Sequence, residues 1–207
     1  MGVPRPPIDL VVRDGNLSVL NAATGHDLTV SLSRVADAAT AEGVTGGLDG
    51  ALFKSRSPSC GIGDARHYQG VVGAEFEDGG GLLAGALRGA LPALPMLDER
   101  QWAVPARRWI FCYRVQVHAL SRREGLRSAL SAIEPGLRDD PFRLDRLRLL
   151  ARFGDRPAFL REAGRARVAR HPDGWPAAWE IRSLAITPRT VRDLHNSRAV
   201  RKDTVSK

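Results

Sequence analysis

The sequence predicts an α/β protein with a small mixed sheet flanked by helices, followed by a basic, mainly helical region. Three observations favour this class. Short apolar runs bounded by turn residues recur in the first half of the chain. Two stretches of that half place apolar residues at helical spacing, and the second half is arginine-rich and helical in pattern. With 207 residues, 43% of them hydrophobic, the chain can bury a substantial core.

The first elements expected are a hairpin and a helix. Residues 8–12 and 17–20 are apolar and flank the turn residues 14–16. Asp27 or Thr29 can cap the helix that follows, which is expected to end near Gly43. Its apolar face should consist of Leu32, Val35, Ala36 and Ala39.

A short strand and a second helix are expected next. Residues 51–54 form an apolar strand that leads into a loop of small and polar residues. After Tyr68 the chain is rich in glycine, and its acidic cluster of Glu75, Glu77 and Asp78 fits a solvated loop. Residues 82–90 predict a helix that Pro92 ends, and Pro95 then introduces a strand or turn into Asp98-Glu99.

The region from Pro105 onward is expected to be helical. The apolar faces predicted there consist of Ile110, Val117 and Leu120 on one side and Phe142, Leu147, Leu150 and Phe153 on another. A boundary near residue 100 would separate a domain at 1–100 from a basic region at 101–207, and the pattern leaves open whether all of the second region folds. A turn at 172–174 and a last short helix from 187 are expected near the end.

The positive charge belongs to the second half of the chain. The net charge is +8, but residues 1–100 hold 8 Lys/Arg and 12 Asp/Glu, net −4, which leaves +12 for residues 101–207. Such asymmetry is typical of a nucleic-acid-binding flank, although 28 arginines against 3 lysines also fit a merely solvated basic face. No membrane span or secretory signal is recognisable, which predicts a cytoplasmic protein.

The loop from residue 54 to residue 61 carries the most specific chemical signal. It reads Lys-Ser-Arg-Ser-Pro-Ser-Cys-Gly and offers hydroxyls, a guanidinium and the Cys60 thiol within a short distance. Small residues let a ligand approach the backbone closely. A thiolate in such surroundings acts as a nucleophile or a metal ligand.

This loop and its neighbours resemble the iron-sulfur-dependent thiouracil and tRNA 4-thiouridine desulfidases, long known as a domain of unknown function. The resemblance covers residues 2–118 and includes, in order, Pro4-Arg5-Pro6, Gly25-His26-Asp27, Ser57-Pro58-Ser59-Cys60-Gly61 and Leu91-Pro92-Ala93-Leu94-Pro95. It implies a [4Fe-4S] cluster held by three cysteines, with one iron open to the sulfur of a thiouracil-type base, free or in tRNA. Longer members add a second, helical domain.

The resemblance also assigns roles to residues of the loop. Cys60 would be the third cluster ligand, and the Ser57 hydroxyl would lie near the substrate. Lys54 and Arg56 would orient the loop or an anionic substrate. The remaining loop residues that the resemblance includes are Ser55, Ser59 and Gly61.

The sequence departs from this family in its cysteines. The other two cluster cysteines belong to segments that precede Pro4-Arg5-Pro6 in the family, and the chain has only Cys60 and Cys112. Cys112 lies among apolar residues and is expected to be a core thiol. We therefore expect an impaired, N-terminally truncated desulfidase. Our hypothesis for the truncation is that the start of the coding sequence was assigned wrongly. The absence of in-frame cysteine codons upstream of Met1 would reject that hypothesis.

Two other functions fit the same residues. Cys60 and Arg66 form the Cys-x5-Arg pattern of cysteine-dependent phosphatases, although Ser59 replaces the usual preceding histidine. Alternatively, the chain is a non-catalytic RNA-binding fragment whose tryptophans stack on bases: Trp102, Trp109, Trp175 and Trp179. His26 and His67 flank the matched segments but fit turn or surface positions.

Overall fold

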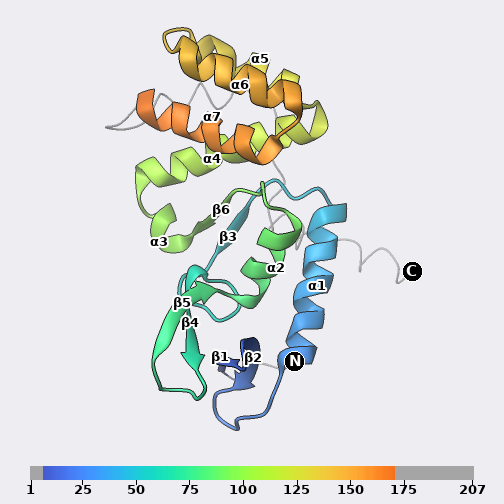
Figure 1. Ribbon diagram of the computed structural model, residues 1–207, viewed down its shortest axis with the longest axis vertical. Coiled ribbons are helices and arrows are strands. Elements are labelled where there is room, and N and C mark those ends of the chain that lie inside the picture. Colours follow the sequence, from blue (N-terminus) through green and yellow to red (C-terminus); the bar gives the residue numbers. More distant parts are fainter. Residues whose placement is uncertain (1–6, 171–207) are drawn as a thin grey trace, which may run out of the picture. The chain divides into compact units, whose positions relative to one another are not determined.

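The chain forms two compact units in a computed structural model that describes residues 7–170, with side chains considered to residue 166. Among the described residues, the sheet unit consists of residues 7–45 and 53–90, and the helical unit consists of residues 46–52 and 91–170. Figure 1 shows the strands and helices of both units in sequence colours. The mixed sheet flanked by helices confirms the predicted α/β class.

The sheet unit is built on four strands in the order β2-β1-β4-β5. Strand β1 (Ile8–Arg13) pairs antiparallel with β2 (Asn16–Asn21) and parallel with β4 (Ile62–Gln69), which pairs antiparallel with β5 (Phe76–Gly80). The predicted hairpin is confirmed, because Asp14 and Gly15 both take positive φ at its turn.

Two helices, α1 (Thr29–Thr45) and α2 (Leu82–Ala90), pack together in the sheet unit. Asp27 starts α1 as expected, since its Oδ1 accepts a hydrogen bond from the Thr29 amide at 2.7 Å. The predicted apolar face of α1 is wrong at Val35, which is 58% exposed, and at Ala39, which is also exposed. The buried residues of α1 are Ala36, Thr40 and Gly43, so small side chains form its packed face.

Strands β4 and β5 were not expected from the sequence. The segment at 75–78, predicted to be a solvated loop, lies largely in β5. Only Ala65 of β4 is buried, and no residue of β5 is, so neither strand shows the apolar alternation by which strands are recognised. Backbone pairing with β1 and between the two strands forms them instead.

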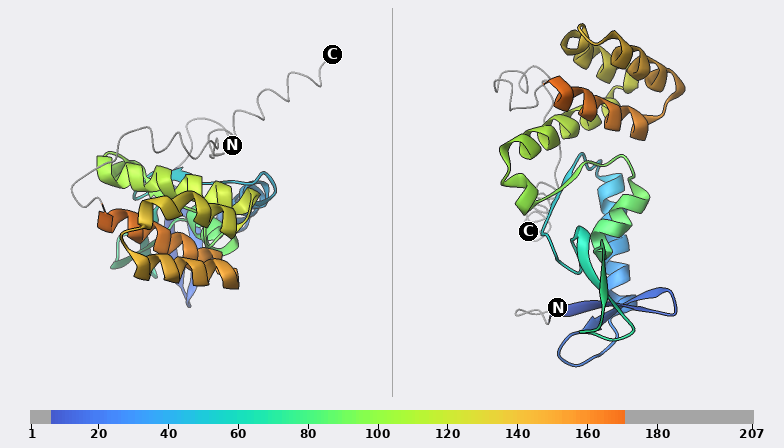
Figure 2. Two further views of the ribbon diagram at one scale, coloured as in Figure 1. Left: turned by 90° about the horizontal axis from the view of Figure 1, so that it is seen from above. Right: turned by 60° about the vertical axis from the view of Figure 1, so that its left-hand side comes forward.

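The helical unit contains a two-stranded sheet and five α-helices among its described residues. Strand β3 (Ala51–Phe53), whose last residue falls in the sheet unit, pairs with β6 (Met96–Asp98). The helices are α3 (Glu99–Trp102), α4 (Pro105–Arg123), α5 (Leu126–Ile133), the 3-10 helix η1 (Glu134–Leu137), α6 (Pro141–Phe153) and α7 (Arg156–Arg170). Figure 2 shows α4 to α7 packed into one bundle.

The core of this bundle confirms part of the predicted apolar faces. Val117, Leu120 and Leu147 are buried in it. Phe142 and Phe153 are 78% and 75% exposed, so their assignment to a buried face is wrong. Both lie at the ends of α6.

A buried carboxylate connects residues 46–52 to α4. The Asp49 side chain is fully buried, and its oxygens lie 3.0 Å from Arg122 Nε, 3.4 Å from Arg123 Nη2 and 3.4 Å from His118 Nδ1. Such a group is stable inside a protein only when opposite charge surrounds it. Asp49 therefore holds its segment on α4, and the helical unit begins in sequence before the expected boundary near residue 100.

The turn at 172–174 and the short helix from 187 lie outside the described residues. Between residues 7 and 170, no helix is long and apolar enough to cross a membrane.

Candidate functional site

The Cys60 loop connects β3 to β4 and occupies residues 54–61. Lys54 and Arg56 are exposed, Ser55 is buried, and the side chains from Ser57 to Cys60 are half-buried. Arg56 takes a positive φ of 55°, which is unusual for a residue with a side chain and requires support from its surroundings. The loop thus presents two cations beside one partly accessible thiol.

Ser57 organises the loop from within. Its Oγ accepts hydrogen bonds from the amides of Ser59 and Cys60, both at 3.3 Å. Its carbonyl accepts from the amides of Cys60 at 3.2 Å and Gly61 at 2.8 Å. Because these amides are satisfied inside the loop, they do not form an open set of donors for an oxyanion. In both of these side-chain bonds, the Ser57 hydroxyl oxygen is the acceptor, so they do not use the hydroxyl hydrogen.

The N-terminus of α2 holds the loop from the other side. The amides of Leu82 and Leu83 donate to the carbonyls of Pro58 and Ser59 at 2.9 and 2.8 Å. The Gly81 amide donates to the Gly61 carbonyl at 2.7 Å. The first amides of a helix need acceptors from outside it, and here the loop backbone supplies them. The loop and the start of α2 therefore form one rigid piece of backbone.

Gly81 permits this close approach. A Cβ atom built on Gly81 would lie 2.6 Å from Cys60 N, 2.6 Å from Ser59 C and 2.7 Å from Gly61 N. Real Cβ atoms essentially never come so near to backbone atoms, so only glycine fits here. Sequence reasoning did not single out Gly81, although its place before an apolar helical pattern could have marked it as a helix start.

Asp64 lies against the end of the loop. A register shift in the β4–β5 pairing falls between Ile62 and Ala65 and contains Asp64. Such bulges re-aim a side chain. Asp64 Oδ1 is buried and has no hydrogen-bond partner among the described residues, and a Cβ on Gly61 would be only 2.9 Å from it. The structure thus brings a carboxylate to the loop that the resemblance did not assign.

Comparisons with known proteins agree with this part of the chain. Residues 1–99 match the family model described as 2-thiouracil desulfurase. The predicted resemblance is thereby confirmed over this region. A solved structure described as the [4Fe-4S]-dependent thiouracil desulfidase TudS shares 31% sequence identity, with a TM-score of 0.39; the match covers 50% of this chain and 62% of that one. The chain therefore spans less than two thirds of that protein. No curated protein matches it.

Cys60 is a half-buried thiol in the region that matches the family model. Among the described residues, no group of three or more His, Cys, Asp or Glu side chains could hold a metal ion. Cys112 lies in α4 of the other unit, partly packed against Leu97, Phe111 and Val115, and burial raises the pKa of its thiol. Of the three thiolates that a cluster of this kind requires, the described residues supply one, and they do not fit it as a complete site.

The residues after Cys60 give the phosphatase pattern little geometric support. Arg66 lies within β4, opposite Asp78, and its guanidinium stacks over the Phe76 ring at 4.8 Å. The residues after Gly61 form a strand, so their amides point into the sheet ladder and do not surround an anion. His67 Nε2 lies 2.9 Å from the Gly80 carbonyl oxygen, which holds the imidazole between β4 and β5. His26 is exposed.

Proposed function

We propose that the Cys60 loop is the substrate loop of a thiouracil desulfidase-type site. One observation carries the proposal: in the region that matches the 2-thiouracil desulfurase family, Ser57 and the α2 amides hold the backbone around Cys60. A pre-organised loop keeps its reactive groups in one geometry, which is what catalysis by positioning requires.

The reaction replaces the sulfur of a thiocarbonyl by the oxygen of water and releases hydrogen sulfide, with no net oxidation or reduction. The residues of this chain bind and orient the base for that step. The Ser57 hydroxyl donates a hydrogen bond to a substrate atom, while its oxygen continues to accept hydrogen bonds from the amides of Ser59 and Cys60. Lys54 and Arg56 attract an anionic substrate. The Asp64 carboxylate is a candidate to accept a proton, since one of its oxygens has no hydrogen-bond partner in the described part of the chain.

The resemblance assigns a [4Fe-4S] cluster to this site, with Cys60 as one ligand. When present, such a cluster supplies an open iron that acts as a Lewis acid toward sulfur. We propose that this chain alone holds the cluster weakly and is impaired as an enzyme, because its only other cysteine is Cys112, in the helical unit. The substrate would be a thiouracil-type base, free or as 4-thiouridine in tRNA, in the cytoplasm.

A second candidate function is RNA binding without turnover. Charges favour it in the helical unit, where arginines outnumber carboxylates. The tryptophans give less support than expected, because Trp102 packs edge-to-face on Phe111 at 6.1 Å and Arg108 lies 5.8 Å from its ring. Trp175 and Trp179 lie outside the described residues.

Anaerobic reconstitution with iron and sulfide tests the desulfidase proposal. Iron content, visible absorption and release of sulfide from 2-thiouracil and 4-thiouridine would be measured for the native chain, Cys60→Ser and Cys112→Ser. We expect a small amount of bound iron that Cys60→Ser removes and Cys112→Ser leaves in place, with any turnover following the iron. Iron binding or turnover that survives Cys60→Ser would overturn the proposal, and so would a native chain that takes up no iron.

A further inference from the structure

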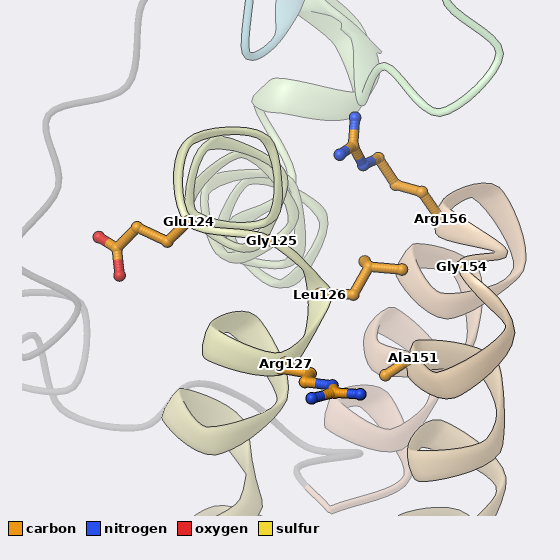
Figure 3. A pocket seen from close by; sticks show the side chains of 7 residues that line it. All are labelled: Glu124, Gly125, Leu126, Arg127, Ala151, Gly154 and Arg156. Carbon is orange, nitrogen blue, oxygen red and sulfur yellow. The ribbon is translucent and has the colours of Figure 1, made fainter.

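The helical unit contains an open hollow that the desulfidase proposal does not use. It has a volume of about 520 Å³ and lies where the end of α4, the start of α5, the end of α6 and the start of α7 meet. Its lining includes Gly125, Leu126 and Arg127 on one side and Ala151 and Arg156 on the other (Figure 3). The hollow is large enough for a phosphate group with an attached sugar.

Two guanidinium groups from different helices give the hollow its charge. Arg127 extends from α5 and Arg156 from α7, on either side of Leu126 (Figure 3). Within residues 7–166, neither forms an ion pair with a carboxylate, whereas Arg143 and Arg148 of α6 do. Arg156 is nevertheless held in place, because its Nη2 donates to the Ser121 carbonyl at 3.1 Å. Two cations without counter-charges favour an anionic ligand.

The nearby carboxylates do not neutralise these cations. The side chain of Glu124 points away from the other residues of the hollow (Figure 3). Asp155 caps α7 instead, since its Oδ1 accepts from the Ala158 amide at 3.0 Å. Arg127 and Arg156 therefore remain in the lining as cations that can attract an anion.

The backbone at the start of α5 adds to this positive potential. The N-cap residue is Gly125, with a φ of 91°, and it has no side chain to accept hydrogen bonds from the first amides. The first intrahelical bond runs from the Ala129 amide to the Gly125 carbonyl at 3.2 Å. The first amides of α5 precede this bond, and the helix dipole at this end favours a negative ligand oxygen.

We propose that this hollow binds a phosphate group esterified to a nucleoside, either as a free nucleotide or in an RNA backbone. Arg127 and Arg156 contact the phosphate oxygens, and their planar guanidinium groups suit that anion. Leu126 and Ala151 give the hollow an apolar wall on which a sugar or base can rest. This site is separate from the Cys60 loop and does not depend on iron.

Binding of uridine 5′-monophosphate and of a short labelled uridine RNA to the full chain tests the proposal. The comparison is between Arg127→Gln and Arg138→Gln. Arg138 is also an exposed arginine; it follows η1 and precedes the start of α6, whereas Ala151 lies near the end of that helix. Within residues 7–166, neither arginine forms an ion pair, so both variants should keep the native circular dichroism.

We expect Arg127→Gln to weaken binding about tenfold or more, since it removes a charge-assisted hydrogen bond, and Arg138→Gln to have little effect. For the RNA, the slope of log affinity against log salt should fall by about 0.7 with Arg127→Gln. Binding of the mononucleotide would identify a free nucleotide as ligand, whereas binding of the RNA alone would identify a backbone phosphate. Absence of binding to both, or equal losses in the two variants, would overturn the proposal.

Discussion

Replacement of Gly81 by alanine gives the sharpest test of how the Cys60 loop is held. The new Cβ atom would lie 2.6 Å from Cys60 N and from Ser59 C. To reach an ordinary contact of about 3.4 Å, the loop and the start of α2 must separate by roughly 0.8 Å. Both sides are backbone, so no side-chain rotation can absorb the shift.

The separation weakens the hydrogen bonds that join the two segments. The bond from the Gly81 amide to Gly61 and that from the Leu82 amide to Pro58 are now 2.7 and 2.9 Å long. Stretched by such a shift, each approaches the limit at which a hydrogen bond is lost. Two such bonds at about 1 kcal/mol each, with strain of about 1 kcal/mol or more, give an expected destabilisation of about 3 kcal/mol.

Urea unfolding and amide hydrogen exchange would measure the effect. The matched control is Gly85→Ala in the same helix, where the added Cβ meets no atom within 4 Å and where alanine should stabilise α2 by up to about 1 kcal/mol. We expect Gly81→Ala to lower the stability and to speed exchange at residues 59–61 and 81–84. If Gly81→Ala proved as stable as Gly85→Ala with unchanged exchange, the description of a rigid joint would be refuted.

Two predictions concern the helical unit. Asp49→Ala should lower the free energy of unfolding of this unit by about 3 kcal/mol, because the cations around a buried carboxylate lose their partner. The control Asp145→Ala removes an exposed ion pair with Arg148 and should cost under about 1 kcal/mol. Equal costs of the two substitutions in urea unfolding would contradict this reasoning. Burial raises the pKa of Cys112 above its usual 9.0, so the folded state holds this proton more tightly than the unfolded state does. The stabilisation of the folded state by this tighter proton binding is fully present below about pH 9 and is lost as the pH rises further. The stability of the native chain should therefore decline above that pH more steeply than that of Cys112→Ala in the same assay, and parallel declines would contradict the assigned burial.

The sequence was most informative where local rules decide the structure. The hairpin at Asp14 and Gly15, the capping of α1 by Asp27 and the end of α2 before Pro92 all follow from turn and helix-end chemistry. The Cys60 loop was located in the same way, by its unusual composition between a strand and a glycine-rich stretch. These features depend on a few adjacent residues, so a single sequence can reveal them.

Features that depend on distant partners were not predictable. Strands β4 and β5 bury a single side chain between them, so their formation rests on pairing that no periodicity indicates. The contact of Gly81 with the Cys60 backbone and the approach of Asp64 to Gly61 join residues that only the folded chain brings together. The faces of α1 and α6 were misassigned at Val35 and Phe142 because apolar residues on exposed positions look the same in sequence as buried ones.

The link between Asp49 and α4 limits how this protein can be dissected. The region that matches the family ends at residue 99, yet Asp49 lies inside it while Arg122, Arg123 and His118 lie beyond it. A fragment cut at the family boundary would retain a buried anion and discard the guanidinium groups of Arg122 and Arg123 that compensate it. Expression of the matched region in isolation would thus yield an unstable product, and deletions intended to isolate the loop chemistry should leave α4 attached.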